Sequence, residues 1–377
     1  MPVYLGAMSG TSLDGIDVAA YKVTSKSCTP KIKFMASVQF PYSNKLRSRI
    51  LNFIDGNGGA EEASTLDTYI AQAYCKAVKK LLKTSELKGV QVEAMGMHGQ
   101  TVWHKPEIGH TLQLGNAALL SQNLVIDVWH DFRSADIAAG GQGAPLAPIV
   151  HHLLFTDKRK NVSVINLGGI ANLTYIPKGA QCLSDLMAYD TGPGVMLIDM
   201  AAMAMGIGAF DKNGRESANH EIDPTLLSRL LSHPYFKKKP PKSTGREEFG
   251  KAFIKWSKTS SNRLSKGTTL ATFTKLTSTT IANEIRRLKK QGKKTDRLVV
   301  CGGGANNCRL VSLLGETLPT VEVVTSDTFG IGTRNVETAL MALLTWCATR
   351  RKSLDLLTIT GSKSPVMLGK LSPAYKT

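Results

Sequence analysis

The stretch that decides the fold is Leu5-Gly6-Ala7-Met8-Ser9-Gly10-Thr11-Ser12-Leu13-Asp14-Gly15-Ile16-Asp17-Val18, close to the start of the chain. An apolar run that begins at Val3 leads into it, and a second apolar run, over residues 16–23, leads out of it. Two apolar runs joined by glycine, hydroxyl and acidic residues predict a β-hairpin with a functional turn.

The turn of this hairpin has the composition of a phosphate-binding site. Gly6, Gly10 and Gly15 permit positive φ and let the backbone approach a ligand closely, and the hydroxyl side chains add donors among exposed backbone N–H groups. Asp14 and Asp17 would repel a bare phosphate, so they indicate a Mg²⁺ ion between carboxylate, water and phosphate. Asp14 is the candidate metal residue, acting through water. An ordinary polar turn is the alternative.

Length and composition bound the class of protein. The chain has 377 residues, 42% of them hydrophobic, which is enough for two cores, and two domains are expected. Its six cysteines lack CxxC spacing, and no apolar run approaches the ~20 residues of a membrane span. The start of the chain has neither a basic nor an apolar leader pattern. We therefore expect a cytoplasmic protein with no membrane partner.

The net charge of +18 raises the question of nucleic-acid binding. The basic residues are spread along the chain in short runs, and no aromatic residues interleave them as a single-strand binder requires. Solvated surface charge is the simpler interpretation, and no nucleic-acid partner is expected.

The order of elements predicts a duplicated β-β-β-α-β-α-β core. The first half is expected to hold strands and helices at about 3–5, 16–23, 32–40, 45–54, 66–82, 94–97 and 111–128, with a loop at 98–104. The same order restarts with a second hairpin at 162–176, whose turn contains Gly168 and Gly169.

A glycine-rich crossover before Pro145 sets the expected domain boundary. The predicted domains are residues 1–143 and 144–359. The C-terminal tail, about 360–377, is a candidate to pack back on the first domain.

The segment Asp190-Thr191-Gly192-Pro193-Gly194 lies between two apolar runs. Pro193 suits the first turn of a helix, whose N-terminus has free N–H groups and the positive end of the dipole. At such a strand-to-helix junction Asp190 would be ionised and directed into a cleft, as a general base for a hydroxyl group or water. A helix N-cap is the alternative role.

Two further patterns bear on ligand binding. Gly302-Gly303-Gly304 follows a predicted strand and opens a helix that contains Asn307, so a flat ring or a phosphate could lie against this backbone. His98, His104 and His110 are spaced more widely than ordinary zinc ligands, and no zinc site is expected.

The pattern Gly6-x-Met8-Ser9-Gly10-Thr11-Ser12-x-Asp14-Gly15-x-Asp17 resembles the signature of the anhydro-N-acetylmuramic acid kinases. This family is a branch of the sugar kinase/actin/Hsp70 ATPase superfamily. The segment at Asp190 resembles a second family motif, in which the Asp is the catalytic base, although Val195 stands where the family usually has Asn. The resemblance implies an α/β fold with two lobes, the actin-like (ribonuclease H-like) ATPase fold, and a central nucleotide cleft.

The resemblance also assigns roles to residues. Asp190 would be catalytic, and Thr101, Arg133 and Glu337 would hold the sugar, since an arginine fork suits the lactyl carboxylate of muramic acid. The residues implied to bind ATP are Gly10, Thr11, Ser12, Leu13, Asp14, Gly15, Ile16, Asp17, Gly168, Gly169, Gly302, Gly303, Gly304 and Asn307.

The implied activity uses ATP and Mg²⁺ to open the ring of 1,6-anhydro-N-acetylmuramic acid and to phosphorylate O6. The products are N-acetylmuramate 6-phosphate and ADP, in peptidoglycan recycling, and the family implies a homodimer. A kinase of levoglucosan or another anhydrosugar is the first alternative. An actin- or Hsp70-like module that uses ATP to switch conformation is the second, although the sugar motifs favour an enzyme.

Overall fold

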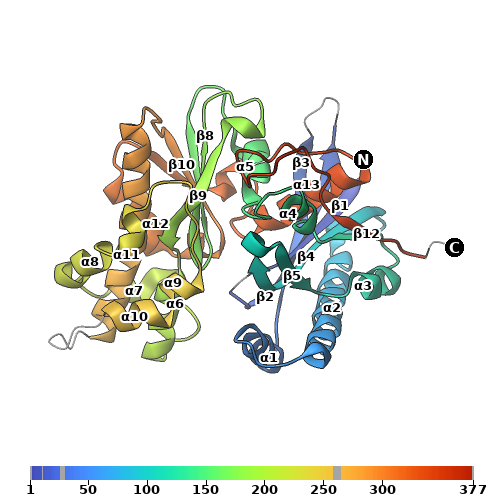
Figure 1. Ribbon diagram of the computed structural model, residues 1–377, viewed down its shortest axis with the longest axis horizontal. Coiled ribbons are helices and arrows are strands. Elements are labelled where there is room, and N and C mark those ends of the chain that lie inside the picture. Colours follow the sequence, from blue (N-terminus) through green and yellow to red (C-terminus); the bar gives the residue numbers. More distant parts are fainter. Residues whose placement is uncertain (1, 11, 26–29, 258–264, 376–377) are drawn as a thin grey trace. The chain divides into compact units, whose positions relative to one another are not determined.

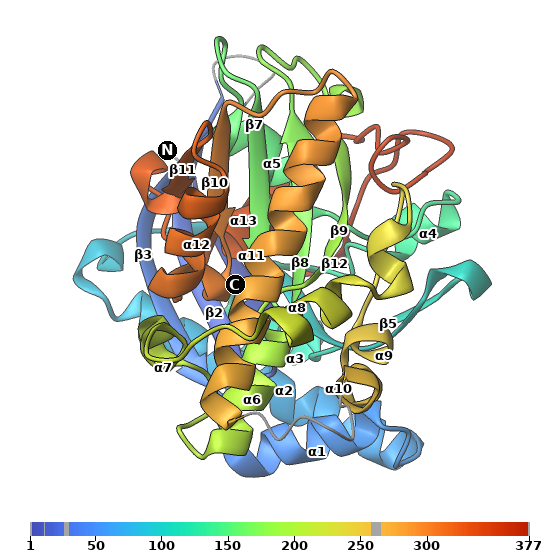
Figure 2. The same ribbon diagram turned by 90° about the vertical axis from the view of Figure 1, so that its left-hand side faces the viewer.

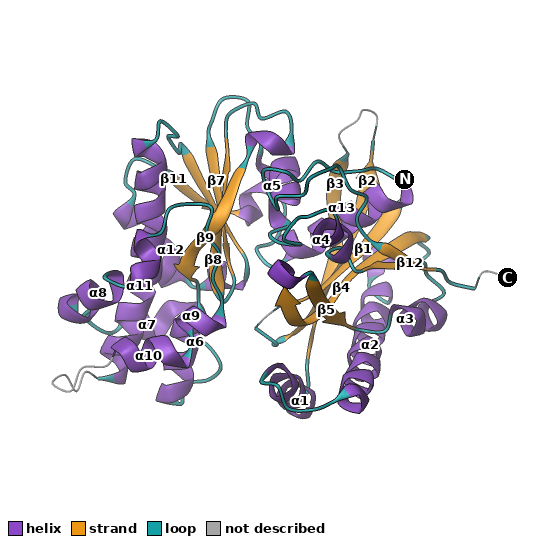
Figure 3. Cartoon of the chain, viewed as in Figure 1, coloured by secondary structure: helices purple, strands orange, loops and turns teal. Residues whose placement is uncertain are grey.

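The computed structural model describes residues 2–10, 12–25, 30–257 and 265–375, and the chain forms two compact units (Figures 1 and 3). Unit 1 comprises Met1–Leu154, Cys182–Ser184 and Arg334–Thr377, and unit 2 comprises Phe155–Gln181 and Asp185–Thr333. Each unit contains one β-sheet with helices packed against it.

The described residues of unit 1 form a seven-stranded sheet in the order β12-β6-β4-β1-β2-β3, with β5 paired to β4. Strands β1, β2 and β3 pair antiparallel, whereas β4 runs parallel to both β1 and β6. The strands are β1 (Val3–Ser9), β2 (Gly15–Thr24), β3 (Lys31–Pro41), β4 (Val92–Lys105), β5 (His110–Leu114), β6 (Val128–His130) and β12 (Lys370–Ser372). The helices are α1 (Asn44–Ile54), α2 (Ala60–Leu82), α3 (Ala117–Leu124), α4 (Ser134–Ala138) and α13 (Asn335–Thr349), and α5 (Ala147–Phe155) leads into unit 2.

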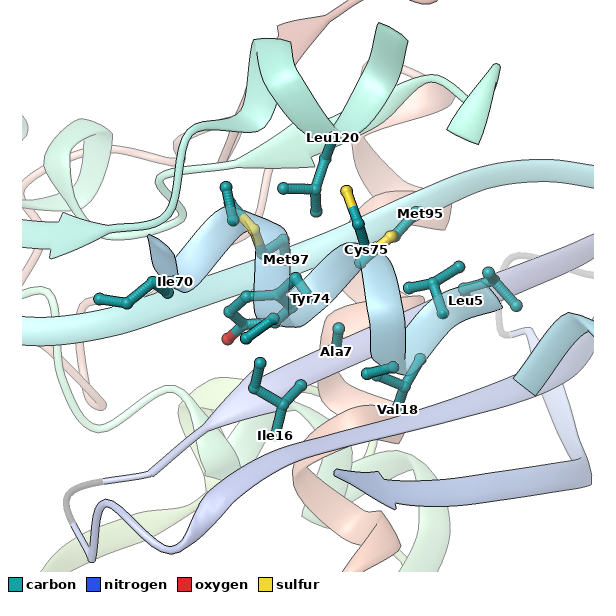
Figure 4. Close-up of a cluster of buried hydrophobic side chains, with 14 of the residues drawn as sticks. Leu5, Ala7, Ile16, Val18, Ile70, Tyr74, Cys75, Met95, Met97 and Leu120 are labelled. Carbon is teal, nitrogen blue, oxygen red and sulfur yellow. The ribbon is translucent and has the colours of Figure 1, made fainter. Parts of the chain in front are cut away.

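Alternation along the central strands of unit 1 places one set of side chains against α2 (Figure 4). Leu5 and Ala7 of β1 lie beside Ile16 and Val18 of β2, and all four side chains are buried among residues of α2 such as Tyr74. Successive residues of a strand point to opposite faces, so Gly6 belongs to the other face.

On that other face, α13 packs directly against two glycines that are paired in register, Gly6 of β1 and Gly96 of β4. A Cβ at Gly6 would lie 1.8 Å from the carbonyl oxygen of Thr338, and one at Gly96 would lie 2.1 Å from Oγ1 of Thr345. Tyr21 of β2 adds a hydrogen bond of 2.7 Å to the carbonyl of Asn335. The first turn of α13 is therefore fixed beside the β1–β2 hairpin.

The described residues of unit 2 form a five-stranded sheet in the order β11-β10-β7-β8-β9. Figure 2 shows α11 along one face of this sheet, where it contacts β8, β9 and α12. The strands are β7 (Val162–Leu167), β8 (Ile170–Ile176), β9 (Met187–Pro193), β10 (Arg297–Cys301) and β11 (Glu322–Thr325). The helices are α6 (Met196–Met205), α7 (Arg215–Ala218), α8 (Pro224–Leu231), α9 (Arg246–Phe249), α10 (Lys251–Ser257), α11 (Lys266–Lys290) and α12 (Cys308–Thr317).

The two sheets share one topology, which confirms the predicted duplication. In each, the first three strands pair antiparallel in sequence order, and the fourth and fifth core strands run parallel on the far side of the first. The strand order 3-2-1-4-5 occurs as β3-β2-β1-β4-β6 and as β9-β8-β7-β10-β11. The fold is α/β, with the duplicated ribonuclease H-like core of the actin-like ATPases.

The structure corrects two of the expectations about organisation. Residues 98–104 continue β4 instead of forming a loop, because they pair with β5. Helix α13, which was expected in the 144–359 domain, joins unit 1 because it packs on β1, β2 and β4. The tail also lies in unit 1, where β12 pairs with β6. Among the described residues, no helix combines the length and the apolar character needed to cross a membrane.

The contact of α13 with β1 yields a prediction about stability. Gly6→Ala is expected to lower the free energy of unfolding of unit 1 by about 1–3 kcal/mol, because its methyl group overlaps the backbone of α13. Urea unfolding followed by tryptophan fluorescence measures this, since three of the four tryptophans (Trp103, Trp129 and Trp346) lie in unit 1.

Gly315→Ala in α12 is the control, because a Cβ there meets nothing within 4 Å. This substitution should leave stability unchanged or raise it slightly through helix propensity. Equal unfolding curves for Gly6→Ala and the wild type would contradict the proposed packing constraint.

Candidate active site

The turn between β1 and β2 is held at its base by polar side chains. Ser9 Oγ donates to Gln100 Oε1 of β4 at 2.5 Å and bonds Tyr42 OH at 2.9 Å. Gln100 Nε2 in turn donates to the Gly10 carbonyl at 3.3 Å. A Cβ at Gly10 would find only Ser12 Oγ, at 3.7 Å, so the backbone there is open on one side. Thr11 lies outside the described residues.

The other residues of this turn act differently from the expectation. Gly6 approaches α13, and Gly15, with φ of +153°, lies against the Phe40 carbonyl, 2.3 Å from where a Cβ would be. At both glycines the space that a side chain would need is filled by the protein's own backbone. The side chains of Leu13 and Ile16 are buried in the core, so only their backbone groups could contact ATP.

Two aspartates flank the turn and face the start of α13. Asp14 is exposed, accepts a hydrogen bond from Ser12 Oγ at 2.8 Å and pairs with Arg334 Nη1 at 3.3 Å. Burial raises the pKa of Asp17 to about 7, Arg334 opposes this shift, and the charges of Asp14 and Glu337 add to it. A cation bound here would favour the carboxylate form of Asp17.

Arg133 is oriented by a neutral histidine. Its Nε and Nη2 atoms lie 3.1 and 2.9 Å from His98 Nε2, and its Nη1 donates to the Gly143 carbonyl at 2.7 Å. Burial, together with the charge of Arg133, lowers the pKa of His98 to about 3, and His98 Nδ1 bonds the Gly99 carbonyl at 2.9 Å. His98 is therefore neutral, with its proton on Nδ1 and Nε2 as the acceptor.

This arrangement leaves part of the guanidinium of Arg133 available. Of its five N–H groups, three donate to His98 and Gly143, which leaves one on each Nη. A carboxylate can accept hydrogen bonds from two N–H groups of one guanidinium. Burial lowers the pKa of Arg133 to about 10, while Glu337 and Asp136 counteract the shift, so the side chain is charged at neutral pH.

A small hollow in unit 1 is lined in part by His98. It has a volume of about 190 Å³ and is lined by residues of β4, β5 and the β6–α4 region, among them His98, Gln113, His130, Asp131 and Ser134. Thr101 pairs with Gln113 across β4 and β5.

The three histidines noted in the sequence do not form a metal site. His98 bonds Arg133, and His104 Nδ1 lies 3.1 Å from Thr111 Oγ1. No group of three or more metal-ligating side chains occurs within residues 2–10, 12–25, 30–257 and 265–375.

In unit 2, Asp190 is held by two donors. Asn172 Nδ2 of β8 donates to Oδ1 at 2.8 Å, and the Thr244 backbone N–H donates to Oδ2 at 3.0 Å. Burial raises the pKa of Asp190, and the two hydrogen bonds counteract that shift. The carboxylate is thus a stronger base than an exposed aspartate.

The position of Asp190 corrects the predicted strand-to-helix junction. Asp190 lies within β9, which ends at Pro193, and α6 begins only at Met196. Its carboxylate therefore does not cap a helix. In the described sheet β9 is an edge strand, where proline is tolerated because no neighbouring strand needs its N–H.

The glycine segments of unit 2 converge on the turn between β7 and β8. The backbone N–H groups of Gly194 and Val195 donate to the carbonyls of Gly169 and Gly168, at 2.8 and 2.9 Å. A Cβ at Gly304 would lie 2.6 Å from Val195 Cγ1. Val195 thus packs against the triplet in place of the family's Asn.

The rest of the triplet region is also closely packed. Gly302 has a φ of +83°, and a Cβ there would lie 2.3 Å from Asn166 Oδ1. Gly303 lies in a short 3₁₀ helix, Gly303–Asn306, so the triplet does not open α12 directly. Asn307 is the N-cap of α12, where its Oδ1 accepts from the Leu310 N–H at 3.0 Å.

The structure therefore brings most of the predicted residues into two sets. Unit 1 gathers Asp14, Asp17 and Glu337, with Arg133 within electrostatic range of Glu337. Unit 2 gathers the glycine turns, and Asp190 lies on the neighbouring strand.

Sequence reasoning missed several residues of these sites. Arg334 could have been noticed as a charge just before α13, and Asn172 lies in the second hairpin, which echoes the first. Thr244 contributes only a backbone N–H group, which no side-chain pattern reveals.

Comparison with known proteins places these sets of residues in context. Residues 2–374 match the family model described as anhydro-N-acetylmuramic acid kinase. A protein of that name from Caldanaerobacter subterraneus subsp. tengcongensis is 34% identical, with 98% of this chain and 96% of the relative covered. Another protein of that name, from Pseudomonas syringae pv. syringae, is 37% identical, with 98% of this chain and 99% of the relative covered.

Proposed function

This chain belongs to the anhydro-N-acetylmuramic acid kinase family, and on that premise we propose how its residues carry out the reaction. The protein is an ATP-dependent kinase that opens the ring of 1,6-anhydro-N-acetylmuramic acid and phosphorylates O6. The products are N-acetylmuramate 6-phosphate and ADP.

The observation that carries the mechanism is the environment of Asp190. Its carboxylate is oriented by Asn172 and Thr244, and burial raises its pKa. We assign Asp190 as the general base that takes a proton from water as the water oxygen bonds to the anomeric carbon. The bond between the anomeric carbon and O6 breaks, O6 bonds to the γ-phosphorus of ATP, and the bond from that phosphorus to ADP breaks.

The β1–β2 turn is the proposed site for the phosphates. The open backbone at Gly10 can donate to phosphate oxygens, and the hydroxyl of Ser12 can do so once it turns away from Asp14. Mg²⁺, when bound, would neutralise charge that develops on the phosphates. Because Mg²⁺ usually binds one or two carboxylates together with water and phosphate, exposed Asp14 fits the water-mediated role, and Asp17 adds charge nearby.

The adenosine and sugar contacts follow from the same assignment. Gly168, Gly169 and the glycine triplet are proposed to bind the nucleotide through their backbone, and Asn307 through the part of its amide that does not cap α12. In unit 1, the two available N–H groups of Arg133 suit the lactyl carboxylate of the sugar. Thr101 and Glu337 are proposed to bind its hydroxyl groups.

The cellular setting is proposed from the family. The reaction would recycle anhydro amino sugars from peptidoglycan in the cytoplasm, with a homodimer as the active species. The conformational-switch alternative is disfavoured because the chain belongs to a family of kinases.

A substitution of Asp190 tests the proposed base. Asp190→Asn should lower kcat by about 10²–10⁴-fold, because the amide cannot accept the proton from water. ATP binding should persist. A coupled ADP-release assay measures turnover, and calorimetric titration measures ATP binding. Asp296→Asn is the matched control, since the carboxylate of Asp296 bonds Asn161 and Lys294 in the same unit. Turnover of Asp190→Asn at the wild-type rate would remove Asp190 from the mechanism.

A substitution of Arg133 tests whether the enzyme prefers the acidic substrate to neutral anhydrosugars. Arg133→Gln should raise KM for 1,6-anhydro-N-acetylmuramic acid by about 10- to 100-fold, as expected for loss of a charge-assisted hydrogen bond of ~1.5–3 kcal/mol. The substitution should affect levoglucosan less, because levoglucosan has no carboxylate. The ratio of kcat/KM for 1,6-anhydro-N-acetylmuramic acid to kcat/KM for levoglucosan should therefore fall. An unchanged ratio would favour the anhydrosugar alternative and contradict the role of Arg133.

A further inference from the structure

The side-chain amide of Asn172 makes one short hydrogen bond and has one acceptor atom without a partner among the described residues. Its Nδ2 donates to Asp190 Oδ1 at 2.8 Å, and Asn172 stands directly opposite Asp190 in the β8–β9 pair, next to a β-bulge. Its Oδ1 is buried and has no hydrogen-bond partner among the described residues. A buried amide with an unpaired acceptor is unfavourable for folding. The hydrogen bond to Asp190 therefore explains why an amide side chain occupies position 172.

A second element fixes Asp190 from the other side. The segment before α9 places the Thr244 N–H on Oδ2 at 3.0 Å, and the Lys242 carbonyl accepts from the Asp190 N–H at 3.0 Å. Lys242 is anchored in turn by a buried ion pair with Glu284 of α11, 2.8 Å long. Tyr235 OH donates to the Asp190 carbonyl at 2.9 Å. The backbone of Asp190 is thus held independently of Asn172.

From this geometry we propose that Asn172 is a positioning residue for catalysis, which sets the orientation and proton affinity of the Asp190 carboxylate at some cost to stability. The inference rests on the proposed role of Asp190 as base. Asn172 acts on the reaction only through Asp190. Because Lys242, Tyr235 and Thr244 hold the backbone and the other oxygen, loss of the amide should release the carboxylate without unfolding the strand.

Other charged and titratable groups also face Asp190. Glu247 of α9 raises its pKa, and Lys242 lowers it. Tyr235 lies beneath Lys242, Glu284 of α11 pairs with Lys242, and Arg287 of α11 pairs with Glu284. These groups remain in place in a variant of Asn172, so a change in the pH profile of that variant reports the lost amide. A donor to a carboxylate favours its charged form, so removal of Asn172 Nδ2 should raise the pKa of Asp190 further.

The test uses Asn172→Leu, which keeps the approximate shape and removes both amide groups. We expect kcat to fall up to about 100-fold, as for a misplaced reacting group. The acid limb of the pH profile of kcat/KM should move up by about one pH unit, because Asp190 must lose its proton to act. Thermal stability should be unchanged or higher, since an unpaired buried acceptor is removed.

A second variant covers the case in which leucine disturbs the fold. Asn172→Asp keeps the polar shape but places a carboxyl group beside Asp190. Two carboxyl groups within hydrogen-bonding distance share one proton. The acid limb of the kcat/KM profile should therefore move to higher pH than in Asn172→Leu.

Asn161→Leu is the matched control in the same unit. Asn161 also donates to an aspartate, at 3.3 Å to Asp296 Oδ2, and its Oδ1 accepts from the Lys178 N–H. This variant should lose stability and keep the wild-type acid limb, which is the reverse of the result expected for Asn172→Leu.

Wild-type kcat and an unshifted acid limb in both Asn172 variants would overturn the inference. Loss of activity together with a large fall in melting temperature and an unshifted limb would also overturn it, because that outcome marks a structural role. The Asp190→Asn variant separates the two proposals. If it is inactive while the Asn172 variants behave as wild type, only the positioning role fails; if it is active, the base assignment itself fails.

Discussion

The unit 1 site depends on the contact between α13 and two glycines paired across β1 and β4. A methyl group at Gly6 or Gly96 would overlap the helix, with the nearest atoms 1.8 and 2.1 Å away. This close approach places the start of α13 beside a hairpin more than 300 residues earlier in the chain, so Arg334 reaches Asp14 and Glu337 raises the pKa of Asp17. The charge around the proposed phosphate turn therefore depends on backbone packing, because the partners come from opposite ends of the sequence.

Unit 2 repeats the topology but uses it for different chemistry. Its first hairpin turn is packed against the segment after β9 and against the glycine triplet, which yields a surface of backbone and small side chains. Its third strand holds Asp190, where burial makes the carboxylate more basic and two donors fix its direction. One duplicated framework thus holds the proposed phosphate turn, with its acidic neighbours, in one unit and the proposed base in the other.

Much of this fold could be predicted from the sequence, because apolar periodicity and turn residues are local signals. Both hairpins and the duplicated order followed from them. The Asp190 segment was assigned to a helix start because Pro193 and its glycines resemble one, yet the position of β9 at the sheet edge tolerates that proline. The strand at 98–104 depends on pairing with β5, and the role of Thr244 depends on a backbone N–H group. Such non-local contacts leave no pattern in the side chains of the segment concerned.

In the proposed reaction, water attacks the sugar while O6 attacks phosphorus. The most direct measurement is mass spectrometry of the products formed from ATP and 1,6-anhydro-N-acetylmuramic acid in ¹⁸O-water, with unlabelled product incubated in the same water as the exchange control. The proposed reaction leaves one ¹⁸O at the anomeric hydroxyl and none in the transferred phosphate. Label in free phosphate with an intact anhydro ring, or a sugar phosphate without label, would contradict it.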